Sequence, residues 1–150
     1  MTRWLAIDHG TRRIGLAVSD PSGSIASPLE VIPAAPQQAV FETVTNYAAD
    51  YETTGVVVGW PLNMDDTEGP QGKLVRQFAA ELAAATNLDV RLWDERLSSA
   101  TADGKLAGLY TRKQKKARQD AVAAAAILQD FLSQGGPDCA PTPADARPPR

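Results

Sequence analysis

The chain has 150 residues, 43% of them hydrophobic, and a net charge of −3, which fits one domain with a core. No apolar stretch approaches the roughly 20 residues of a membrane span. Polar residues interrupt the N-terminal apolar run too early for a signal peptide, so we expect a cytoplasmic protein without membrane contact. The single cysteine and single histidine exclude an intrachain disulfide and a zinc site built on those ligands. Any metal must be held by oxygens, which favours Mg or Mn.

Apolar alternation and turn residues predict three short strands at the start of the chain, joined as an antiparallel meander. They cover residues 4–7, 14–18 and 24–32. Helical spacing then predicts a helix over 37–52, with Gly55 ending it as a C′ glycine. A fully apolar strand at 56–58 and a loop over 59–69 follow.

The second half of the chain continues the alternation of helices and strands. The predicted elements are a helix over 71–86, a strand over 90–93, a short helix over 98–106, an irregular segment over 108–114 and a helix over 115–132. Right-handed crossovers then give an α/β fold with a mixed five-stranded sheet and helices on both faces. Five prolines after residue 134 predict that residues 1–134 form the domain and that 135–150 are a disordered tail.

Three acids stand where this topology can bring them together. Asp8 ends the first strand and Glu95 follows the fifth, so parallel strands would place both at one sheet edge. Asp120 lies on the apolar stripe of the last helix, in register with Ala124, Ile127, Leu128 and Phe131. Crowded carboxylates repel one another unless cations lie between them, and paired divalent ions cleave phosphodiesters. We therefore predict that the three acids are catalytic and bind metal, although a turn aspartate and a helix-start aspartate are ordinary structural alternatives.

Basic residues predict a nucleic-acid partner despite the acidic total, because local charge binds phosphates. The candidates are Arg12, Arg13, Asn63, Arg96 and the cluster Arg112, Lys113, Lys115, Lys116 and Arg118. The cluster can also be a solvated helix start, the arginines near the acids can pair with them, and Asn63 can belong to a plain loop. His9 can act as a base, but a histidine in a tight turn is more often a turn residue.

Four motifs together resemble the YqgF/RuvX family. They cover the opening residues 5–20, the central loop at 57–65 and 69–71, the Asp-Glu-Arg motif at 93–98, and the last helix at 120–128. The resemblance implies a ribonuclease H-like fold and a cytoplasmic bacterial nuclease that matures the 5′ end of 16S ribosomal RNA on ribosome precursors. It also implies an alternative, a Holliday junction resolvase acting on branched DNA, and symmetric cleavage of a four-way junction calls for a two-fold dimer.

Carried over by position, the family's acidic site is Asp8, Glu95 and Asp120. RuvC-like enzymes carry a further acid one turn later, where this chain has Ala123. RNA and DNA substrates are not distinguished by the sequence, nor are a monomer and a dimer. Two other classes stay open: a nucleotide-binding protein, because residues 8–11 also resemble the phosphate motif of the actin and Hsp70 superfamily, and a non-catalytic RNA-binding factor of ribosome assembly.

Overall fold

The computed structural model describes residues 3–97 and 119–146. Its sheet consists of five strands, which are β1 Trp4–His9, β2 Arg13–Ser19, β3 Ala26–Pro33, β4 Gly55–Trp60 and β5 Asp89–Asp94. The helices are α1 Gln37–Asp50, α2 Pro70–Thr86 and α5 Gln119–Ser133, with short 3-10 helices η1 Glu95–Leu97 and η2 Gly136–Cys139. The predicted elements in these ranges are confirmed, with ends that differ by a few residues.

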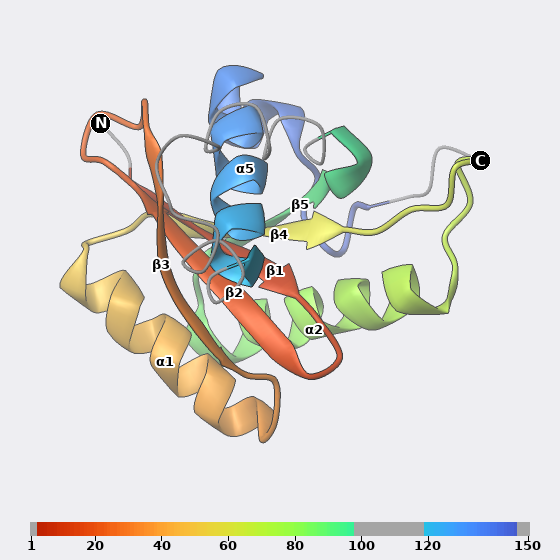
Figure 1. Cartoon of the computed structure of the whole chain (residues 1–150), viewed down its shortest axis with the longest axis horizontal. Helices are drawn as coiled ribbons and strands as arrows, with labels where there is room; N and C mark the ends of the chain where they lie inside the picture. The colour runs from red at the N-terminus through yellow and green to blue at the C-terminus, as the bar shows by residue number, and fades with distance from the viewer. Residues whose placement is uncertain (1–2, 98–118, 147–150) are drawn as a thin grey trace.

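The strand order is β3-β2-β1-β4-β5. β1, β2 and β3 pair antiparallel, whereas β4 is parallel to both β1 and β5. This is the predicted mixed sheet, and its parallel strands all end at one edge. Figure 1 shows α5 on one side of the sheet and α1 and α2 on the other.

Alternation along the strands divides the core into two layers. Leu5 and Ile7 of β1 pack with the buried residues of α1 and α2. Trp4 and Ala6 face the opposite way and pack under α5, against residues such as Phe131. The next side chains in β1 continue this alternation, so Asp8 belongs to the α5 face and His9 to the α1/α2 face.

The end of α1 differs from the prediction that Gly55 closes it. The helix ends at Asp50, and Glu52 takes the left-handed conformation with φ 52°. The amide of Thr53 donates to the carbonyl of Ala48 at 2.9 Å, which satisfies the helix end in the Schellman manner. Gly55 instead begins β4, where a Cβ would lie 2.7 Å from the Trp4 ring.

The C-terminal segment, residues 135–146, is ordered, whereas the sequence predicted a disordered tail. The guanidinium of Arg91 in β5 donates to the carbonyl oxygens of Pro137 and Ala140 at 2.8 and 2.9 Å. The backbone amide of Leu92 donates to the carbonyl oxygen of Pro141 at 2.9 Å. Ala146 is fully buried in the α1/α2 layer. The segment covers the backbone of edge strand β5, so prolines that favour disorder in isolation are held by tertiary hydrogen bonds.

Other predictions fall on residues that the structure does not describe. These are the short helix over 98–106, the irregular segment over 108–114, the start of the last helix before residue 119, and the tail end 147–150. In the described part of the chain, no helix has the length and apolar character needed to cross a membrane.

Candidate active site

The start of α5 lies directly on β2, and this contact brings Asp120 to Asp8. Asp8 pairs with Gly15 across the β1–β2 ladder. A Cβ on Gly15 would lie 1.9 Å from the backbone carbonyl oxygen of Asp120, so only glycine permits this approach. The first turn of α5 is therefore held above the strand position opposite Asp8.

Glu95 reaches the same site from the other end of the sheet edge. It begins η1, directly after β5. Its Oε2 atom would lie 2.9 Å from a Cβ built on Gly59, which occupies the α5 face of the neighbouring strand β4. The missing side chain at residue 59 makes room for the carboxylate, and β4 spans the gap between β1 and β5.

The electrostatics show that these carboxyls are near one another. Burial, and after it the negative charge of Asp120, raises the pKa of Asp8 to about 6. Burial likewise raises the pKa of Glu95 to about 7, with contributions from Asp8 and then Asp94. Both causes penalise the ionised form, so the site favours an added positive charge. The structure thus brings the three predicted acids to one place.

The donor chemistry of the site suits a divalent cation, because carboxylate oxygens are the ligands that Mg and Mn prefer. Among residues 3–97 and 119–146, however, no three Asp, Glu, His or Cys side chains lie close enough together to hold a metal ion as they stand. One carboxylate is also engaged elsewhere, since Arg13 Nε lies 3.2 Å from Asp120 Oδ2 in an ion pair. Arg13 is 70% exposed, so this pair is weak and the arginine can move away.

Arg13, at the start of β2, and Arg12, directly before it, are both exposed. Arg13 pairs with the Asp120 carboxylate, which is the alternative raised for these arginines. The structure therefore brings Arg13 to the acids, and Arg12 stays a predicted contact to nucleic acid.

Several partners hold the partly exposed side chain of Arg96. Its guanidinium donates to Asp94 Oδ2 at 2.7 Å, to Asp66 Oδ1 at 3.0 Å and to the carbonyl oxygen of Asn63 at 2.7 Å. The carboxylates of Asp94 and then Asp66 raise the pKa of Arg96. Pairing with carboxylates is therefore what the structure shows for Arg96. It ties the loop after β4 to the end of β5, directly before Glu95.

Asn63 belongs to the same loop and stays exposed. Its side-chain amide donates to Thr67 Oγ1 at 3.0 Å, within the turn. The loop is also anchored to α2, where Arg76 forms an ion pair with the buried carboxylate of Glu68 at 2.7 Å. The loop is thus a braced structure beside the acids, and Asn63 stays a predicted contact to nucleic acid.

The basic cluster Arg112, Lys113, Lys115, Lys116 and Arg118 lies outside the described residues. His9 lies apart from the acids, on the α1/α2 face. Its ring packs against Phe78 with centroids 4.4 Å apart, and burial lowers its pKa. His9 is therefore a half-buried aromatic group, and nothing brings its ring to the acidic cluster.

Comparison with known proteins identifies the family. The family model RuvX, described as Holliday junction resolvase, matches residues 2–134. The chain belongs to the RuvX family. A relative from Roseiflexus sp. is 43% identical over 87% of this chain and 93% of its own length, and one from Anaeromyxobacter sp. is 44% identical over 90% and 99%. Both carry the name "Putative pre-16S rRNA nuclease". Family and relatives thus indicate a nuclease.

Solved structures support the RuvX assignment at the level of the fold. Thermus thermophilus RuvC in complex with a Holliday junction substrate matches with a TM-score of 0.57 and 17% identity, over 90% of this chain and 97% of that one. The Fowlpox virus resolvase bound to junction DNA matches with a TM-score of 0.53 and 11% identity, over 88% and 97%. The predicted ribonuclease H-like fold is confirmed.

Two glycines that shape the site were not among the predicted functional residues. Gly15 and Gly59 interrupt otherwise apolar strands, and an isolated glycine in a strand often marks a close approach. That signal was available in the sequence. The brace formed by Glu68 and Arg76 had no local signal, because its partners are eight residues apart across a loop and a helix start.

Proposed function

We propose that this RuvX-family chain is a metal-dependent endonuclease that cleaves phosphodiester bonds in structured RNA and processes the 5′ end of pre-16S ribosomal RNA in the cytoplasm. The observation that carries the proposal is the convergence of Asp8, Glu95 and Asp120 from three separate elements. Two of these acids have raised pKa values, which is typical of functional sites. The names of the relatives supply the substrate.

Asp8, Glu95 and Asp120 are the proposed ligands of Mg or Mn. When bound, such ions activate water and stabilise the leaving oxygen. The chain's part is to give up protons: with a pKa of about 7, Glu95 is half protonated at neutral pH and must ionise to act as a ligand. Arg13 is placed to leave Asp120 and pair with a substrate phosphate, beside Arg12.

The second candidate is a resolvase that acts on branched DNA, favoured by the description of the family model. Symmetric cleavage of a four-way junction needs a two-fold dimer, whereas trimming an RNA end does not. The oligomeric state therefore separates the two candidates. A monomer that cleaves precursor RNA supports the first, and a dimer that cuts paired junction strands supports the second.

The test is a nuclease assay of the purified full chain on precursor 16S ribosomal RNA and on a four-way DNA junction. Each substrate is incubated with Mg, with Mn and with EDTA. We expect cleavage of the RNA with either metal and none with EDTA. Cleavage that persists in EDTA would contradict the metal-dependent mechanism, and cleavage of the junction alone would replace the RNA substrate by branched DNA.

A further inference from the structure

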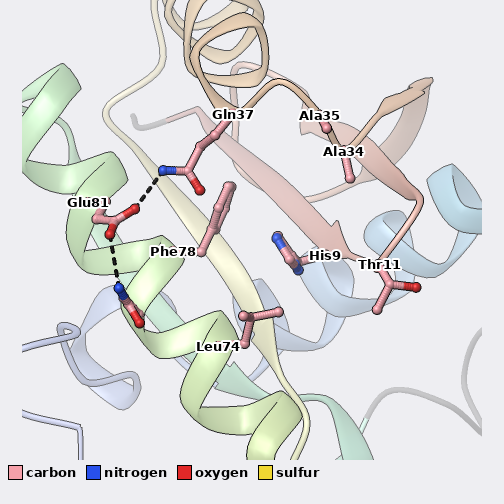
Figure 2. Close-up of a pocket in the computed structure, with 10 residues that line it drawn as sticks. His9, Thr11, Ala34, Ala35, Gln37, Leu74, Phe78 and Glu81 are labelled. Atoms are coloured by element: carbon pink, nitrogen blue, oxygen red, sulfur yellow. Dashed lines mark hydrogen bonds between the residues drawn. The ribbon is translucent and has the colours of Figure 1, made fainter.

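A pocket of about 440 Å³ opens on the α1/α2 face of the sheet, beside the end of β1. Figure 2 shows its lining, with Phe78 between Glu81 on one side and His9 on the other. The turn after β1 closes the pocket toward the sheet edge through Gly10 and Thr11. Its size is in the range of ligand-binding cavities.

One wall of the pocket is made of hydrogen-bond acceptors. Gln37 and Gln77 donate through their side-chain nitrogens to the two carboxylate oxygens of Glu81, at 2.5 and 3.2 Å. Because a carboxylate only accepts, both amides must turn their nitrogens to it, and each keeps its carbonyl oxygen as an acceptor. The wall therefore suits a ligand edge that carries N–H donors.

The rest of the pocket is aromatic and aliphatic. The half-buried ring of His9 rests on Phe78, which is itself 3% exposed, and Leu74 and Ala35 complete the apolar lining. No lysine or arginine lines the pocket in the described part of the chain. A phosphate would thus meet the Glu81 carboxylate without a compensating cation, whereas a flat, uncharged ring with N–H groups fits both walls.

The pocket and the acidic site are joined through one peptide bond. Asp8 and His9 are consecutive residues with Cα atoms about 3.8 Å apart, and their side chains leave β1 on opposite faces. A nucleic-acid strand that crosses the turn after β1 can thus place its backbone at Asp8 while a base from the same strand enters beside His9.

We propose that this pocket takes one unstacked nucleobase of the substrate, specifically a base with an exocyclic amino group, next to the phosphodiester held at Asp8. Guanine, adenine and cytosine present such a group to Glu81. Uracil has no exocyclic amino group, and its one ring N3–H donor lies between two carbonyl oxygens that the carboxylate repels. This inference rests on the proposed nuclease function and adds to it a preference for the base beside the cleaved bond.

The single histidine of the chain is a direct reporter of this pocket, since its ring resonances need no assignment. The full chain, labelled with carbon-13 and kept in EDTA to prevent cleavage, is titrated with hexauridylate and with hexamers that carry one central guanosine, adenosine or cytidine. We expect the His9 ring resonances to move with the three substituted hexamers, with hexauridylate leaving them nearly in place.

Glu81→Gln tests the acceptor wall. It should weaken binding of the substituted hexamers about tenfold, as expected for one hydrogen bond to a charged group, and should not weaken hexauridylate binding, because the carboxylate that repels uracil is gone. Glu42→Gln is the matched control, because Glu42 is also an exposed helix glutamate that accepts from a glutamine four residues earlier but lies outside the pocket. It should bind all hexamers like the wild type.

Three results would overturn the pocket proposal: no response of His9 to any hexamer, equal responses to all four, or unchanged affinities in Glu81→Gln. Thermal melting of each variant confirms that it is folded. Because these titrations contain no metal, they are independent of the cleavage assay. If the chain cleaves RNA but shows no base preference, only the pocket proposal is contradicted. If it shows the base preference but does not cleave, only the proposed nuclease function is contradicted.

Discussion

Asp8 and His9 are neighbours in β1, yet their side chains lie in different layers of the molecule. Burial acts on both: it raises the pKa of Asp8 to about 6 and lowers the pKa of His9. In each case it favours the neutral form. Only Asp8 also has like-charged neighbours, because Asp120 and Glu95 lie on its face. A cation is therefore stabilised on the α5 face, beside Asp8, and among the described residues it has no such group of acids to bind beside His9 on the α1/α2 face.

The two faces also differ in how closely the helices approach. Under the start of α5 the sheet presents Gly15 and Ala17, so the backbones lie near each other there. Near the end of the helix, Trp4 and Trp93 instead pack against Phe131. Under α1 and α2 the layer is built from valine, leucine and phenylalanine. Close backbone contact sets the positions of the acids on one face, whereas larger side chains leave an open pocket on the other.

The largest expected effect is on activity, when one acid on the α5 face is neutralised. Asp8→Asn, Glu95→Gln and Asp120→Asn should each lower the cleavage rate by at least about a thousandfold, because each removes a ligand charge. Their melting temperatures in EDTA should equal or exceed that of the wild type, since a repulsive charge is gone. Asp50→Asn, at the exposed end of α1, should keep full activity. Cleavage retained in any one site variant would remove that residue from the site.

The next effect concerns the close approach of α5. Gly15→Ala should lower the free energy of unfolding by about 3 kcal/mol or more, because the new Cβ meets backbone at 1.9 Å. Gly59→Ala should cost only about 1 kcal/mol, since it meets the movable ends of Ile127 and Glu95. The second variant should instead lose activity by displacing Glu95. Urea unfolding and the cleavage assay measure the two effects, and equal stability losses would contradict the distinction between backbone and side-chain contact.

The C-terminal segment joins the two faces, because Ala140 packs in the α5 layer and Ala146 in the α1/α2 layer. Truncation after Gly135 should therefore destabilise the protein by about 2 kcal/mol, the net effect of losing its hydrogen bonds to β5. Arg91→Gln should cause part of this loss, and Lys73→Gln on the exposed side of α2 should cause none. An unchanged melting temperature after truncation would show that the segment contributes nothing to stability.

The smallest effect is the pH dependence that the α5 face imposes. The pKa of Asp8 is raised in the folded state, so the folded protein holds a proton that the unfolded chain has lost above pH 4, and stability falls as pH rises. In EDTA we expect a loss of about 1.4 kcal/mol between about pH 5 and 7 from this residue. Asp8→Asn should flatten the curve, and Mg should reverse the slope in the wild type, because cation binding requires ionised acids. A rising wild-type curve in EDTA would contradict the raised pKa.

For the residues that the structure describes, the sequence by itself determined the order of strands and helices and the mixed sheet, and it predicted that the three acids come together, because hydrophobic periodicity and strand-end carboxylates are local signals. Asp120 was found through its register on the apolar stripe of its helix. The predicted end of α1 was wrong. Glycine is the residue that most readily takes the left-handed conformation, which pointed to Gly55, but Glu52 takes it three residues earlier.

Only the tertiary structure decided which groups meet. The register of Asp8 with Gly15, the pairing of Arg96 with Asp94 and Asp66, and the docking of residues 135–146 on β5 all join segments that are far apart in the chain or have equally suitable local partners. The same holds for the pocket beside His9, whose walls come from the turn after β1, from α1 and from α2. Such contacts depend on the free energy of packing whole layers together, and no local pattern of residues encodes that quantity.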